Sequence, residues 1–286
     1  MTKGIIKFRV GVVLISAMVG IGFQGFAQQP GGQPPIAESL SYIAQLFVKQ
    51  TVVKFDSVLI QNRLATGRIT NSSLDFRLET GETSSLKTSE IAALMFDQVR
   101  AKIVLQSGER LSGQLLTDVE IALVGADNLK IKFSKEFLHN GLGMVVLNGQ
   151  LQNLTSEEFQ ELLNRFLKLV TRADIIVFQN DSILAGLVTN QIFQLDEFYF
   201  NKSEIAEIIF GPLCQLRTTS GQVMVGTMRT PTVTVELLSE QSRFEFAVQT
   251  LARILFRDRT VTFSRIASIV ERLIPGEEGS HPRGRS

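Results

Sequence analysis

A recurring apolar string is the feature that most constrains the fold of this chain. Two similar copies, Ser89 to Phe96 and Ser203 to Phe210, begin with Ser-Glu-Ile-Ala and end in Phe. A more diverged third copy, Gln249 to Phe256, keeps the apolar positions and the final Phe but has Thr250 where the others have glutamate. A recurring string of this kind indicates that the fold is assembled from similar short pieces.

Each string follows a glycine that lies inside an apolar, strand-like pattern. These glycines are Gly67, Gly186 and Gly226, and a fourth, Gly113, marks a unit whose closing string, around Glu136-Phe137-Leu138, has diverged. Short apolar runs and Asn, Asp, Ser or Gly turn signals precede the glycines, so each unit is expected to open with a β-hairpin. Glycine within a strand is typical of a bend or bulge, which lets a small sheet curl.

Strands with one buried face are expected after the glycines. Residues 74–78 and 233–237 alternate apolar and polar side chains, a period of two. A unit of roughly 40 residues is too small to bury its own core, so the units are expected to associate in pairs.

An amphipathic helix is predicted after each pair of units. The first has an apolar stripe and a capping box formed by Thr155 and Glu158. Its stripe contains Phe159, Leu162, Leu163, Phe166, Leu167 and Val170. The second has its stripe at Phe263, Ile266, Ile269, Val270 and Leu273. A third, shorter helix is expected over 38–49.

The predicted fold is therefore mainly β with a few helices. It consists of four small curled antiparallel sheet or barrel units in two tandem pairs, each pair followed by an amphipathic helix. The expected segments are a signal peptide (1–27), a flexible leader (28–36), the first pair with its helix (37–171), the second pair with its helix (172–275) and a disordered tail (276–286).

The N-terminus predicts export. Basic residues, including Lys3 and Arg9, precede an apolar run over 10–23 and small residues that end at Ala27, the pattern of a secretory signal peptide. Cleavage near Ala27 would release an extracytoplasmic protein, periplasmic or secreted. The alternative is that the segment is retained as a membrane anchor, the one way in which this sequence predicts membrane contact.

The order of strand, glycine-containing strand, further strands and closing apolar string resembles the small Sm-like and SH3-like barrels. The resemblance extends over 52–256 and consists of apolar spacing and glycine positions. The third unit, with Gly186-Leu187-Val188-Thr189-Asn190, is most similar, but it lacks the acidic and asparagine pair that RNA-binding members of the Sm group carry just after this glycine. RNA binding is therefore not implied.

Composition and the scarcity of reactive side chains argue against several functions. Lys and Arg number 29 and Asp and Glu number 28, so no global field favours nucleic acid. The single cysteine, Cys214, excludes a disulfide framework and is expected in the core. Of two histidines, His281 lies in the tail and His139 is expected to be a turn or cap residue. We therefore predict no catalytic, cofactor or metal site.

Two functions stay open on the sequence. The first is a non-enzymatic exported binding or scaffold protein with an unknown protein or glycan partner, for which Tyr199 is the candidate contact. In Phe198-Tyr199-Phe200, Tyr199 faces outward if its neighbours face the core, unless another unit covers it. The alternative is a carboxylate-based hydrolase or carbohydrate-binding protein. Its candidate carboxylates are Asp75, Glu79, Asp118, Glu120, Asp196 and Glu197.

Overall fold

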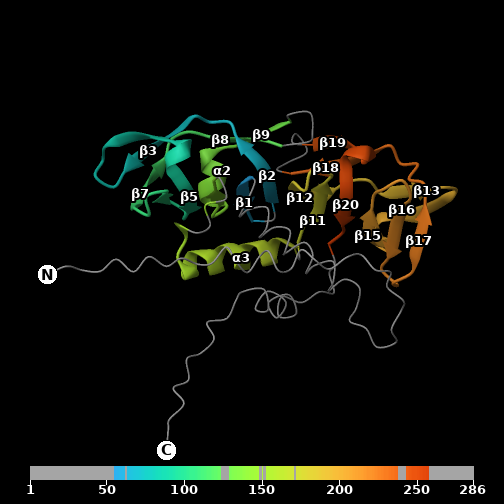
Figure 1. The fold of residues 1–286 in the computed structure, drawn as a ribbon. Helices are drawn as coiled ribbons and strands as arrows, with labels where there is room; N and C mark the ends of the chain where they lie inside the picture. Colours follow the sequence, from blue (N-terminus) through green and yellow to red (C-terminus); the bar gives the residue numbers. More distant parts are fainter. Residues whose placement is uncertain are drawn as a thin grey trace, which may run out of the picture. The chain divides into compact units, whose positions relative to one another are not determined.

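The computed structural model describes residues 55–61, 63–123, 129–147, 150, 153–170, 172–237 and 243–257. Within these ranges the chain is mainly β, with antiparallel strands and two α-helices (Figure 1). The expected signal peptide, the leader, the helices over 38–49 and 263–273 and the tail lie outside the described residues. None of the described helices is long and apolar enough to span a bilayer.

The strands and helices fall into two runs along the chain. The first run contains β1 (Asp56–Ile60), β2 (Arg63–Ile69), β3 (Ser73–Leu78), β4 (Thr83–Lys87), the 3-10 turn η2 (Thr88–Glu90), β5 (Ile91–Phe96), β6 (Ala101–Leu105), β7 (Arg110–Leu115), β8 (Val119–Ala122), β9 (Lys130–Phe133), α2 (Lys135–Asn140), β10 (Met144–Val146) and α3 (Ser156–Val170). The second run contains β11 (Asp174–Phe178), β12 (Ile183–Val188), β13 (Ile192–Leu195), β14 (Phe198–Asn201), η4 (Lys202–Glu204), β15 (Ile205–Ile209), β16 (Cys214–Thr218), β17 (Val223–Gly226), β18 (Thr232–Glu236), β19 (Arg243–Ala247), η6 (Val248–Thr250) and β20 (Leu251–Leu255).

Strand pairing in the first run combines local hairpins with long-range contacts. The hairpins are β1–β2, β3–β4, β5–β6, β6–β7 and β8–β9. β5 lies between β6 and β10, and β10 pairs on its other side with β1. β3 also pairs with β7, and β2 pairs with β8. Strands from the two predicted units therefore alternate in one sheet.

The prediction that a unit closes into its own barrel is wrong. After β5 the chain turns at once, because the Asp97 backbone N–H donates to the Arg100 carbonyl at 2.8 Å and the Asp97 carboxylate accepts the Val99 N–H at 2.8 Å. A turn this tight places the next strand, β6, directly beside β5. Strand β1 is completed by β10 instead, and the sheets are not closed into barrels.

The closing strand of the second predicted unit also differs from the expectation. The string at Glu136-Phe137-Leu138 lies in α2, which begins after Ser134, whose hydroxyl accepts the Phe137 N–H at 3.1 Å. The strand that lies between β1 and β5 is instead β10, further along the chain. A serine N-cap starts this helix although its apolar residues match a strand pattern.

The second run contains the hairpins β11–β12, β13–β14, β16–β17 and β18–β19. β15 pairs with β16 and β20, β20 pairs with β11, and β12 pairs with β18. The two runs meet where β2 pairs with β12, through Ala65 opposite Leu184 and Leu64 opposite Ala185. The buried Thr66 hydroxyl accepts the Ile183 N–H at 2.6 Å and lies 3.1 Å from the Ile183 carbonyl oxygen.

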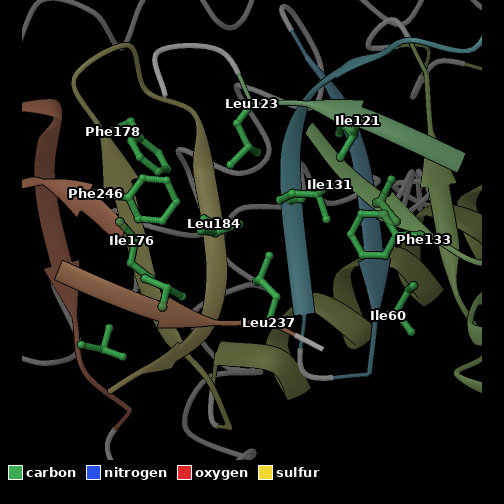
Figure 2. Close-up of a cluster of buried hydrophobic side chains, with 14 of the residues drawn as sticks. Ile60, Ile121, Leu123, Ile131, Phe133, Ile176, Phe178, Leu184, Leu237 and Phe246 are labelled. Atoms are coloured by element: carbon green, nitrogen blue, oxygen red, sulfur yellow. The ribbon is translucent and has the colours of Figure 1, made fainter. Parts of the chain in front are cut away.

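One large apolar cluster fills the interior on both sides of this joint. Figure 2 shows the side chains of Leu123 and Leu237 between the blue strands of the first run and the olive strands of the second, with Ile131 beside the blue strands and Leu184 beside the olive ones. In the second run Phe178 and Phe246 pack edge to face with ring centroids 5.1 Å apart. The core is thus continuous across the joint and contributes to holding the two runs together.

Helix α3 covers the opposite face of the sheet. Its buried residues Leu162, Phe166 and Leu169 pack with residues of β1, β2, β10, β11 and β12. Every residue of β1, β5 and β11 is consequently buried, whereas β3, β8 and β18 show the expected alternation of buried and half-buried residues. The predicted half-exposed sheet is therefore present only where no helix covers it.

The predicted capping box at the start of α3 is confirmed. The Thr155 hydroxyl accepts the Glu158 N–H at 3.2 Å, and the Glu158 carboxylate accepts the Thr155 N–H at 2.7 Å. Glu158 is buried and also pairs with Lys102 at 2.5 Å and Arg110 at 3.1 Å. Burial opposes ionisation, but the hydrogen bonds from Arg110, Lys102 and Thr155 lower the pKa of Glu158 to about 2.

Candidate functional site

The β13–β14 hairpin exposes more large apolar surface than the other described hairpins. Its register places Phe193 opposite Phe200 and Gln194 opposite Tyr199. Phe193 is fully buried and Phe200 packs against the core, whereas Tyr199 is 69% exposed on the opposite side. Tyr199 therefore faces away from the core, and none of the described residues covers it.

Phe198 does not meet the condition that both neighbours of Tyr199 face the core. It pairs across the hairpin with the buried Leu195, yet it is 59% exposed. The strand begins at Phe198, so its ring lies at the end of the hairpin. Ile192, at the start of β13, is exposed as well.

The hairpin is fixed to the body of the protein through β13. The Asp196 N–H donates to the Thr227 carbonyl at 2.8 Å, and the Asp196 carboxylate accepts the Thr227 N–H at 2.9 Å. Leu195 forms an isolated bridge with Met228. The Phe193 ring also packs edge to face on Phe256 with centroids 5.5 Å apart. These contacts hold one side of the hairpin and leave β14 as its outer strand.

Strand β17 adds two exposed valines near this hairpin (Figure 1). Val223 and Val225 are about half exposed and alternate with Met224, which packs against the core. Because successive strand residues face opposite sides, both valines face away from the core. We call Ile192, Phe198, Tyr199, Val223 and Val225 the apolar surface. The sequence did not separate these valines from core residues, because Val223-Met224-Val225 is apolar on both faces.

Five hairpins in the described chain have an outer strand with a single strand partner. Of these strands, β14 with its two exposed aromatic rings and β17 with its two exposed valines differ in chemistry from β4, β9 and β19. β9 exposes Lys130 and Lys132, and β19 exposes Arg243 and Glu245. β4 exposes two hydroxyl residues and a lysine, whereas β14 exposes two aromatic rings. Charged residues on an outer strand discourage pairing with another chain. β14 exposes no charged residue, so this obstacle to pairing with another chain is missing there.

Cys214 and His139 are buried and do not contribute to this surface. Cys214 is buried, which confirms the predicted core position. His139 is also buried, in the last turn of α2, where its ring packs edge to face on Phe96 and Nδ1 lies 3.1 Å from the Asp97 carbonyl oxygen. Among the described residues no His, Cys, Asp and Glu side chains gather into a group that could hold a metal ion.

The candidate carboxylates are mostly held by cations or backbone groups. Asp118 pairs with Lys132 at 2.9 Å, and Glu120 pairs with Lys130 at 2.8 Å. Hydrogen bonds from these lysines lower the pKa of both carboxyl groups. A hydrolytic general acid requires the opposite, a carboxyl group that stays protonated near neutral pH. Glu79 pairs with Arg100 and Asp196 binds the Thr227 N–H, so the structure does not favour a carboxylate pair for hydrolysis.

Comparison of the chain with protein-family models, with curated proteins and with solved structures found no match.

Proposed function

We propose that this chain is an exported, non-enzymatic binding or scaffold protein whose docking element is the outer strand β14. The observation that carries this function is the pair of exposed aromatic rings on β14. The outer strands β4, β9 and β19 expose charged or hydroxyl residues, and the outer strand β17 exposes two valines but no aromatic ring. An exposed strand can accept an extended segment of a partner protein as an additional strand. In this arrangement the partner segment would pair with the β14 backbone and cover Tyr199.

In this proposal, β14 belongs to a scaffold of two pairs of β units. Within each pair, the last strand of the second unit completes the sheet of the first unit. The recurrence of pairings supports it: β1–β10, β5–β6, β5–β10 and β2–β8 in the first run correspond to β11–β20, β15–β16, β15–β20 and β12–β18 in the second. Each pair would bury a core that neither unit could form alone.

Two sets of side-chain contacts also recur between the pairs. The Asp56 carboxylate accepts the Ile69 N–H at 2.7 Å, and the Asp174 carboxylate accepts the Val188 N–H at 2.8 Å. Asn71 bridges to β8 and Asn190 bridges to β18 through the same two kinds of hydrogen bond. Identical roles for residues at matching positions favour duplication of a two-unit segment.

Photo-crosslinking would test the docking function. A photoreactive phenylalanine analogue at position 199 is expected to yield a specific protein adduct when the protein is expressed in its native compartment. Ser85 is the matched control, because it lies on β4 three residues before η2, as Tyr199 lies on β14 three residues before η4. The adduct should disappear in Phe198→Lys, which gives β14 a charge of the kind that the outer strands β4, β9 and β19 carry. Equal adducts from positions 199 and 85, or none from position 199, would contradict the proposal.

Export is proposed on the basis of the N-terminal pattern that ends at Ala27. N-terminal sequencing of the protein recovered outside the cytoplasm is expected to begin at Gln28. A protein that begins at Met1 and stays with the membrane would instead indicate a retained anchor.

A further inference from the structure

A polar pocket of about 490 Å³ lies where β12 ends beside β18 and β19. Its lining residues are Thr189, Asn190, Thr234, Arg243 and Glu245. Asn190 is fully engaged in the wall, since its amide donates to the Thr232 carbonyl at 3.1 Å and its side-chain oxygen accepts the Thr234 N–H at 2.7 Å. The remaining groups offer two hydroxyls, one guanidinium and one carboxylate. The Thr189 hydroxyl also makes a long contact of 3.4 Å to the Thr234 carbonyl oxygen, as the Thr70 hydroxyl does at 3.5 Å to the Glu120 carbonyl oxygen.

The first run contains the same local construction with different chemistry. There Asn71 donates to the Asp118 carbonyl at 3.0 Å and accepts the Glu120 N–H at 2.8 Å, so Glu120 occupies the position of Thr234. The Glu120 carboxylate accepts the Thr70 hydroxyl at 2.6 Å and pairs with Lys130 at 2.8 Å. A carboxylate of the chain itself therefore binds the threonine and the cation.

The second run keeps the threonine and the cation but not the carboxylate. Thr189 matches Thr70, since each donates its backbone N–H to the strand partner, Thr234 or Glu120. Arg243 matches Lys130, because each lies on the outer strand two residues before the partner of Thr234 or Glu120. Among the described residues no ion pair engages the Arg243 guanidinium.

Two carboxylates near Arg243 restrict what the pocket can bind. Glu236 lies directly opposite Arg243 in the strand pair, and Glu245 lies two residues further along the same face of β19. The Glu245 carboxylate accepts the Thr232 hydroxyl at 2.5 Å through one of its oxygens. A ligand with only negative charge would be repelled by these groups, whereas a ligand that also carries a positive group would be attracted to Glu245.

We propose that this pocket binds a small zwitterion, an amino carboxylate. The ligand carboxylate takes the place that Glu120 has in the first run, between the Arg243 guanidinium and the Thr189 hydroxyl, and the ligand ammonium pairs with Glu245. Arginine suits this role because its planar fork can donate two parallel hydrogen bonds to one carboxylate. The pocket lies on different strands from β14, and the proposal does not depend on the proposed docking function.

Titration of the full chain with L-serine, followed by NMR at the Thr189 and Thr234 amides, tests the site. An open polar pocket predicts a dissociation constant on the order of 1 mM. Glycerate, which has a hydroxyl where serine has an ammonium, and serine methyl ester, which lacks the carboxylate, should each bind at least about tenfold more weakly, because each loses one charged contact.

Three variants and one control complete the test. Arg243→Gln and Glu245→Gln should each weaken serine binding about tenfold or more, since each removes one charged partner. Thr234→Glu should abolish it, because the new carboxylate would bind Arg243 as Glu120 binds Lys130. Arg229→Gln removes an exposed arginine elsewhere and should leave binding unchanged. Glycerate binding as tight as serine, unchanged affinity in the three pocket variants, or no saturable shift at all would each overturn the proposal.

Discussion

Replacement of Glu158 by glutamine should remove the ion pairs that connect the start of α3 to the sheet. The shape of the side chain is nearly unchanged by this replacement. The Glu158 carboxylate is buried and receives hydrogen bonds from Arg110, Lys102 and the Thr155 N–H. Glutamine keeps an oxygen that can accept the Thr155 N–H, so the capping bond can persist. The two cations then lose the negative charge that they surround.

The pKa of Glu158 sets the size of the effect. Its carboxyl group has a pKa of about 2 in the folded protein and an ordinary value of 4.5. A difference of this size corresponds to about 3 kcal/mol of stability when the group is ionised in both states. Because the folded pKa is the lower one, this stability is complete well above pH 4.5 and declines as the pH falls toward 2. About 1 kcal/mol should remain near pH 3.

Urea unfolding of the parent protein and of Glu158→Gln at pH 7 and near pH 3 measures this directly. The variant should lose about 2 to 3 kcal/mol at pH 7 and only about 1 kcal/mol near pH 3. Glu161→Gln is the control on the same helix, since Glu161 makes an exposed pair with Arg165 one turn away and should cost less than about 0.5 kcal/mol. A loss for Glu158→Gln that is the same at both pH values would refute the electrostatic explanation.

Two further substitutions and one measurement of thiol reactivity probe the joint and the core. Thr66→Val should cost about 1 to 3 kcal/mol in urea unfolding and speed hydrogen exchange at the Ile183 amide, because the Ile183 N–H loses its buried acceptor. Gly67→Ala should cost at least about 2 kcal/mol, since a Cβ there would lie 2.1 Å from the Ala122 carbonyl oxygen; a variant with unchanged stability would show that β2 can shift away from β8. Cys214 is buried, so its thiol should react with Ellman's reagent far more slowly in the native protein than in urea, and equal rates would count against its core position.

The sequence predicted features that depend on neighbouring residues. The capping box at Thr155 and Glu158 is set by their spacing along one turn, and the structure contains both hydrogen bonds. The hairpin turns follow from local glycine, asparagine and serine chemistry in the same way. The outward side of Tyr199 follows from strand alternation once Phe193 and Phe200 are assigned to the core.

Features that depend on distant residues were not accessible from these patterns. That β1 pairs with β10 and not with β5 follows from the tight turn at Asp97 and from contacts more than 80 residues apart in sequence. The burial of β5 on both faces requires neighbouring strands and packing on each side, which its own residues do not reveal. The exposure of Val223 and Val225 has the same origin, because an apolar strand does not indicate which of its faces is covered.

The long-range pairing of β1 with β10 also bears on how the protein is made. A chain that emerges from the ribosome N-terminus first presents the β1–β2 hairpin early, but the strand that completes the β1 edge, β10, is synthesised about 85 residues later. Until Met144 to Val146 have emerged, the β1 edge has no partner and the first sheet stays open. The first sheet can therefore be completed only well after its first hairpin has been synthesised.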